Sequence, residues 1–144
     1  MNGSQVVIDA SFALRLFLPH PLRGNVREIL TGLVVQGYQL VAPMLWAYET
    51  TSGVSRAVYM KAILPHEARR LLNHLEDMQV LLVSPDEDQN NRALEWTLKL
   101  NRGAAYDSYY LALAETFGCD LWTADRRLYN AIDTTWVRWI EERL

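Results

Sequence analysis

Short apolar runs alternate with longer helical patterns along this chain of 144 residues. The first run, Val6-Val7-Ile8, is β-branched and too short for a helix, which predicts a buried strand that ends at Asp9. Further strands are expected at 38–42, 80–83, 120–123 and 136–140. Strands that alternate with helices pair in parallel and are covered on both faces. The pattern therefore predicts a single domain over residues 1–144, α/β in class, with three α/β/α layers and a central parallel sheet of four to five strands.

The segments between these runs carry signals for helix starts and ends. Pro43 suits the first turn of a helix, where its missing N–H costs nothing. Ser84 and Glu87 have capping-box spacing, which predicts that a helix starts at Ser84. Gly118 follows the most apolar helical segment and is expected to be its C-cap. Helices are expected at 10–18, 22–37, 43–59, 65–78, 84–100, 104–117 and 125–131.

The composition excludes several classes of protein. Half of the residues are hydrophobic and 22% are charged, which is typical of a globular fold rather than of a disordered chain. The net charge of −3 argues against nucleic-acid binding by bulk positive charge, although a local basic patch remains compatible with it. A single cysteine, Cys119, precludes an intramolecular disulfide and favours a cytoplasmic setting. We find no signal peptide and no apolar run near the ~20 residues that span a membrane.

Four carboxylates stand where strands are expected to end and helices to begin. Asp9 and Asp125 follow two of the apolar runs, Asp107 opens the most apolar helix, and Glu49 lies in the apolar setting Leu45-Trp46-Ala47-Tyr48. In parallel α/β sheets, ligands bind in the crevice outside the carboxyl ends of the strands. Clustered carboxylates without basic partners repel one another and need a cation to neutralise them. Together the four acids indicate a metal site.

Each acid also has an ordinary structural explanation. Asp9 and Asp125 can cap the helices that follow them. Asp107 lies in a first turn, where the helix dipole favours a negative charge, and Glu49 can be an exposed residue of a helix face. The combination of all four favours the metal site over four independent structural roles.

Other catalytic motifs are absent from the sequence. There is no phosphate-binding G-x-x-x-x-G-K-[ST], no dinucleotide-binding G-x-G-x-x-G and no nucleophile elbow. The three histidines lack metal-ligand spacing and are expected at the surface, and Cys119 has no triad partner and is expected in the core.

The ordered set of motifs resembles the PIN-domain family, and specifically the VapC-type toxin ribonucleases. The resemblance runs from VVIDAS through the Pro43 helix with Glu49 to AAYDSYYLALAE and LWTADRRL, over essentially the whole chain. It implies a PIN fold and a metal-dependent endoribonuclease. It carries over Asp9, Glu49, Asp107 and Asp125 as the catalytic, metal-binding acids, with Ser11 and Thr123 as hydroxyls that support them.

The resemblance also implies a cofactor and partners. The expected cofactor is Mg²⁺ or Mn²⁺, as one or two ions, because hard cations prefer carboxylate and water oxygens. The expected partners are an RNA substrate, a small antitoxin protein whose C-terminal segment crosses the active-site groove, and a second copy in a homodimer. Arg15, Arg126 and Arg127 are candidates for the RNA phosphates, or alternatively form a solvated helix face. Four aromatic residues can line the groove or the dimer interface, or lie in the core: Trp46, Tyr48, Tyr59 and Trp96.

Two alternative functions remain open from the sequence. One is a non-catalytic binding module that keeps the PIN fold, and the other is a PIN nuclease that acts in RNA processing outside a toxin–antitoxin pair. Neither the target RNA nor a choice of RNA over DNA follows from these residues.

Overall fold

The fold is built around one five-stranded parallel sheet with the strand order β3-β2-β1-β4-β5. The structure, a computed structural model, describes residues 4–142. The strands are β1 Gln5–Ile8, β2 Gln39–Pro43, β3 Leu81–Val83, β4 Leu121–Thr123 and β5 Val137–Trp139. The helices are α1 Ala10–Phe17, α2 Arg23–Val35, α3 Leu45–Tyr59, α4 Pro65–Asp77, α5 Glu87–Lys99, α6 Tyr106–Phe117 and α7 Arg126–Ala131. The predicted α/β class with a parallel sheet is confirmed.

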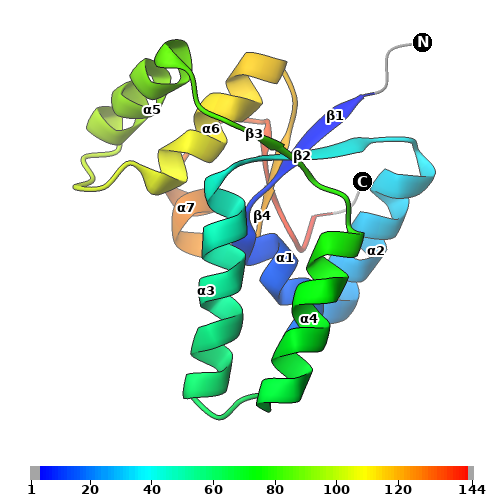
Figure 1. Cartoon of the computed structure of the whole chain (residues 1–144). Helices are drawn as coiled ribbons and strands as arrows, with labels where there is room; N and C mark the ends of the chain where they lie inside the picture. Colours follow the sequence, from blue (N-terminus) through cyan, green and yellow to red (C-terminus); the bar gives the residue numbers. More distant parts are fainter. Residues whose placement is uncertain (1–3, 143–144) are drawn as a thin grey trace.

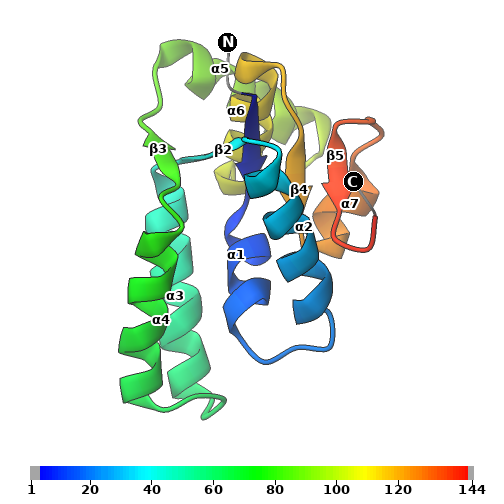
Figure 2. The same ribbon diagram turned by 90° about the vertical axis from the view of Figure 1, so that its right-hand side faces the viewer.

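The uniformly apolar sequence of β1 suits its central position in the sheet. Val6, Val7 and Ile8 are at most 1% exposed, because this strand pairs with β2 on one side and β4 on the other and is covered on both faces. Helices α1 and α2 lie on one side of the sheet and α5 and α6 on the other (Figure 2). Helices α3 and α4 extend together as a hairpin away from the strands (Figure 1). No helix in residues 4–142 is long and apolar enough to cross a membrane.

Two predicted helix starts are wrong. Pro43 is the last residue of β2, paired with Val83, and α3 begins at Leu45. The Met44 N–H donates to the Val83 carbonyl at 3.0 Å, so sheet pairing continues past the proline and delays the helix. The helix predicted from Ser84 begins instead at Glu87, with Asp86 as its N-cap.

The Asp86 side chain accepts a hydrogen bond from the Gln89 N–H at 2.8 Å. Aspartate is as good an N-cap residue as serine, and this contact replaces the predicted capping box. The predicted C-cap is confirmed, because Gly118 ends α6 in the left-handed region at φ +59°.

The aromatic residues divide between core and surface. Trp46 and Trp96 are 5% and 9% exposed and belong to the core, whereas Tyr48 and Tyr59 are 68% and 87% exposed.

Close packing sets the distance between α1 and α3. A methyl group placed on Gly53 of α3 would lie 2.3 Å from the Leu14 side chain of α1, so the two helices approach each other over a glycine.

Candidate metal centre

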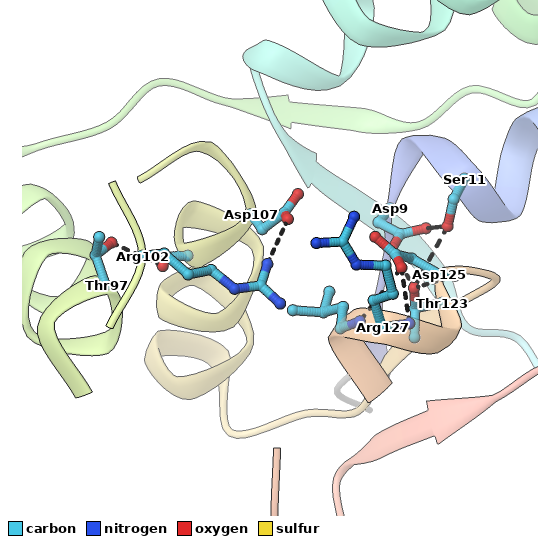
Figure 3. Close-up of polar contacts among 10 residues, drawn as sticks. Asp9, Ser11, Thr97, Arg102, Asp107, Thr123, Asp125 and Arg127 are labelled. Atoms are coloured by element: carbon cyan, nitrogen blue, oxygen red, sulfur yellow. Dashed lines mark hydrogen bonds and ion pairs between the residues drawn. The ribbon is translucent and has the colours of Figure 1, made fainter. Parts of the chain in front are cut away.

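The candidate site lies at the carboxyl ends of β1 and β4. Asp9 directly follows β1, and Asp125 comes two residues after β4. Asp107 is the second residue of α6, and Glu49 lies in the second turn of α3. Figure 3 shows Asp9 and Asp125 side by side with Asp107 across from them. Four separate elements therefore bring the predicted acids to the same edge of the sheet.

Asp9 is held by three hydrogen bonds. Its Oδ1 accepts from the Phe12 N–H at 2.8 Å and from the Ser11 hydroxyl at 2.6 Å, and its Oδ2 accepts from the Thr123 hydroxyl at 2.5 Å. Asp9 therefore does cap α1, as the structural explanation expected. Ser11 and Thr123 contact this carboxylate directly, and their hydroxyl oxygens lie 3.4 Å apart. The two predicted supporting hydroxyls thus fix the orientation of Asp9.

Burial makes Asp9 an unusual acid. Desolvation raises its pKa from 3.8 to about 6, although the Ser11, Thr123 and Phe12 hydrogen bonds oppose the rise. The negative charge of Asp107 adds to the rise. Asp9 is only 5% exposed, so its charged form is costly at neutral pH unless a positive charge lies close to it.

Asp125 has one carboxylate oxygen in a helix cap and one oxygen open. Its Oδ1 accepts from the Arg127 and Leu128 N–H groups at 3.0 and 3.2 Å, which caps α7. Its own N–H donates to the Thr123 hydroxyl at 2.9 Å. The Oδ2 atom accepts no hydrogen bond from residues 4–142. The side chain that caps α7 can therefore still bind a ligand.

Asp107 has a basic partner that the sequence reasoning missed. Its Oδ2 lies 2.9 Å from Arg102 Nη1, and the positive charge of Arg127 also acts on it. Arg102 is held in place by the hydrogen bond from its N–H to the Thr97 carbonyl at 3.1 Å (Figure 3). Burial and the charge of Asp125 nevertheless leave the pKa of Asp107 raised. The expectation of acids without basic partners is therefore wrong for Asp107.

Glu49 is tied to the core by Tyr110, a second residue that the sequence reasoning missed. The Tyr110 hydroxyl donates to Glu49 Oε1 at 2.7 Å, and Tyr110 is only 1% exposed. Burial and the charge of Asp107 raise the pKa of Glu49, and the Tyr110 hydrogen bond opposes this. Tyr110 lies three residues after Asp107 and thus on the same face of α6, a spacing from which it could have been found.

The acids interact as one group centred on Asp107. Its charge raises the pKa of both Asp9 and Glu49, and Asp125 raises the pKa of Asp107 in turn. Within residues 4–142, no three acidic, histidine or cysteine side chains stand close enough to surround one ion. The chemistry of the donor set nevertheless fits a hard cation. All donors are oxygens, and Glu49, Asp107 and Asp125 each keep one carboxylate oxygen without a hydrogen bond from the described residues.

The three predicted phosphate-binding arginines differ in their placement. Arg127 is exposed and its charge acts on Asp107, which puts it beside the acids (Figure 3). Arg126 lies over the Trp139 ring, 5.1 Å from its centre, and faces Glu141 at 3.7 Å. Arg15 is half-buried in α1, and its charge acts on His20. Arg127 is therefore the arginine with the clearest connection to the acidic group.

A comparison with protein families identifies the family of this chain. A family model described as PIN domain matches residues 6–133. The chain belongs to the PIN-domain family. This confirms the resemblance found in the motifs, and the matched range includes all four acids of this PIN domain. None of the curated proteins matches the chain in sequence.

Several solved structures share the PIN fold. A toxin–antitoxin complex from Klebsiella pneumoniae is 14% identical, with a TM-score of 0.62, and the match covers 90% of this chain and 96% of the other. VapC20 from Mycobacterium tuberculosis, described as a toxin that cleaves the sarcin-ricin loop, is 15% identical with a TM-score of 0.65 and the same coverage. VapBC-1 from nontypeable Haemophilus influenzae is 18% identical with a TM-score of 0.62, covering 94% and 96%. At these identities the matches establish the fold.

Proposed function

We propose that this PIN-domain protein is a metal-dependent endoribonuclease. The proposal rests on the group of four acids that four elements bring to one edge of the sheet: Asp9, Glu49, Asp107 and Asp125. The charge of Asp107 raises the pKa of Asp9 and of Glu49, and the charge of Asp125 raises the pKa of Asp107. Such a group binds divalent cations through oxygen and so suits phosphodiester hydrolysis. The fold match to VapC20, described as a toxin that cleaves the sarcin-ricin loop, supports this proposal.

The residues divide the work of the reaction. Asp9, Asp107 and Asp125 would hold Mg²⁺ or Mn²⁺, as one or two ions, and Glu49 would hold it through water or help to activate the nucleophile. A bound divalent ion supplies an acidic centre that activates water and stabilises charge on the phosphate. Ser11 and Thr123 fix the orientation of Asp9 through hydrogen bonds of 2.6 and 2.5 Å.

The arginines near the acids are candidates for binding the substrate. Arg127 lies beside Asp107 and is the first candidate for a phosphate of the RNA, while Arg15 and Arg126 are further candidates. Water is the expected nucleophile, so the products should carry 5′-phosphate and 3′-hydroxyl ends. Products with a 2′,3′-cyclic phosphate would mean attack by the 2′-hydroxyl and would contradict this mechanism.

The proposed biological role is the toxin of a type II toxin–antitoxin pair. Two of the structures that share its fold are toxin–antitoxin complexes, which supports a small antitoxin protein as a partner. A cytoplasmic location and a homodimer complete the proposal. Light scattering at micromolar concentration measures the mass of the particle, and a purely monomeric protein would exclude the homodimer.

A cleavage assay tests the nuclease directly. The purified chain is incubated with a pool of structured and single-stranded RNA in Mn²⁺, in Mg²⁺ and in EDTA. We expect cleavage with a metal and none in EDTA or with Asp9→Asn. The matched control is Asp133→Asn, which removes the same charge from an exposed residue without a role in the site. Cleavage must persist when the nucleotide at the cut carries no 2′-hydroxyl.

The outcome of this assay separates the alternative functions. A folded protein, free of bound antitoxin, that cuts no RNA with either ion would favour the binding module. Cutting of single-stranded DNA at the same rate would place the protein among general PIN nucleases. Cleavage without an antitoxin gene beside its own would favour RNA processing.

A further inference from the structure

A pocket of about 600 Å³ opens directly beside the candidate metal centre. Its lining comes from α1, α3 and Tyr106, the first residue of α6. Ser11 and Glu49 belong to its wall, and both belong to the candidate site as well. A substrate that is cut at the four acids would therefore lie next to this pocket. We call it the α1–α3 pocket.

Two exposed tyrosines border the α1–α3 pocket. Tyr48 and Tyr106 are 68% and 67% exposed, and neither ring nor hydroxyl has an aromatic or hydrogen-bond partner in residues 4–142. Neither side chain is therefore needed to fill the core. Exposed aromatic rings next to a phosphodiester site are the usual platforms for stacking of unpaired bases.

An arginine stands at the far end of the same pocket. Arg56 lies on α3 seven residues after Glu49, which is two helical turns and about 10 Å along the helix axis. It forms no salt bridge with the described residues. The α1–α3 pocket thus offers a carboxylate at one end, a cation at the other and aromatic rings at its border.

The charge distribution favours a polyanion on this side of the molecule. Residues 10–77, which span α1 to α4, contain seven basic and five acidic residues. Residues 78–144 contain seven basic and eleven acidic residues. Apart from Tyr106, the pocket is built from the basic part. The part of the chain that contributes most of the pocket lining is therefore net basic, although the whole chain carries a net charge of −3, and a net basic part favours a polyanion.

We infer that the α1–α3 pocket receives an unpaired base of the RNA next to the phosphodiester bond that is cut, with Tyr48 and Tyr106 stacking on it. Arg56 then faces a neighbouring phosphate. This inference rests on the proposed nuclease function and names the form of its substrate. A base can enter the pocket only after leaving its own helix, so the preferred substrate is single-stranded RNA or a loop. Three leucines line the pocket and provide an apolar surface for the flat face of a base: Leu14, Leu18 and Leu45.

A binding experiment without cleavage tests the inference. The probe is a fluorescent 12-nucleotide oligouridine in EDTA, compared with an abasic ribose-phosphate chain of the same length and charge. Wild type should bind oligouridine at least about 5-fold more tightly, because stacking on one aromatic side chain changes affinity by roughly 5- to 150-fold. Tyr48→Ala and Tyr106→Ala should each reduce this preference, and the double variant should abolish it.

Four control variants isolate the stacking interaction. Tyr48→Phe and Tyr106→Phe keep the ring and should bind oligouridine within about twofold of wild type. Tyr59→Ala removes a still more exposed tyrosine of α3 that lies outside the pocket and should also leave affinity unchanged. Arg56→Gln should weaken binding of both probes equally, because it acts on phosphate rather than on the base.

The possible failures are distinguishable from failure of the nuclease proposal. Equal binding of the two probes by wild type would overturn the pocket inference even if RNA is cut. Tyrosine variants that keep the base preference but lose affinity for an antitoxin would assign the pocket to a protein partner and also overturn it. A base preference carried by the two tyrosines in a protein that cuts no RNA would support the pocket while refuting the nuclease.

Discussion

Replacing Asp9 with asparagine should stabilise the metal-free protein at neutral pH and abolish its activity. Asp9 is 5% exposed, and burial raises its pKa from 3.8 to about 6. Between these two values the folded protein holds a proton that the unfolded chain has already released. Stability is therefore lost as the pH rises through this range. At about 1.4 kcal/mol for each unit of pKa, the complete loss is about 3 kcal/mol.

The pH dependence gives the prediction its discriminating power. From the same two pKa values, the loss grows by about 2 kcal/mol between pH 4.5 and pH 7.5, nearly all of it below pH 6.5. For a chain of about this length, 1 kcal/mol changes Tm by roughly 2–4 °C. The Tm of Asp9→Asn relative to wild type should thus rise by about 4–8 °C across this range in EDTA. The asparagine carbonyl can still accept the Phe12 N–H, so the cap is retained.

Thermal unfolding followed by circular dichroism at four pH values measures this difference. Asp133→Asn, the exposed control, should change Tm by no more than about 2 °C throughout. Saturating Mn²⁺ should raise the Tm of wild type and leave Asp9→Asn unchanged, because the proposed site would bind the ion only when it is folded and contains the Asp9 carboxylate. A difference that does not vary with pH, or a variant less stable than wild type at pH 7.5, would refute the reasoning and identify Asp9 as a structural cap alone.

Three further substitutions test individual contacts. Arg102→Gln removes the 2.9 Å salt bridge to Asp107 and should therefore lower the Tm in EDTA. It should also tighten Mn²⁺ binding several-fold in titration calorimetry, because a competing positive charge is lost. Weaker binding would mean that Arg102 orients Asp107 for the ion. Tyr110→Phe removes a hydrogen bond to the carboxylate of Glu49 and should lower the free energy of unfolding, measured in urea, by about 1.5–3 kcal/mol. It should also reduce kcat more than it changes KM. An unchanged kcat would show that this hydrogen bond only stabilises the fold. Gly53→Ala places a methyl group 2.3 Å from a leucine of α1, so it should lower stability by about 1–3 kcal/mol, and an unchanged urea midpoint would show that α1 and α3 can move apart.

The elements that carry the acids could be predicted because their signals are local. Val6-Val7-Ile8 is uniformly apolar, and such a run fits a central strand of a parallel sheet, where β1 is found. Gly118 and Pro65 mark the end of α6 and the start of α4, as their backbone preferences require. Because parallel strands end at one edge of the sheet, knowledge of where β1 and β4 stop was enough to place Asp9 and Asp125 together.

The partners of the acids could not be predicted in the same way. The bond from Tyr110 to Glu49 joins α6 to α3 across 61 positions of sequence, so it depends on how the two helices pack. Arg102 follows the end of α5, and its side chain reaches Asp107 only because the turn before α6 brings it back. Pro43 shows the limit of local propensity from the other direction, since pairing with β3 overrides its preference for a first helical turn.

The capping role of Asp9 and its proposed role as a metal ligand are compatible. A carboxylate has about four lone-pair positions. The Phe12 N–H and the Ser11 hydroxyl occupy both positions on Oδ1, and the Thr123 hydroxyl occupies one on Oδ2. One position on Oδ2 remains, and the three donors fix its direction. The structural explanation and the proposed function therefore involve the same side chain. The cap orients the carboxylate, and a cation bound at the remaining position would neutralise its buried charge.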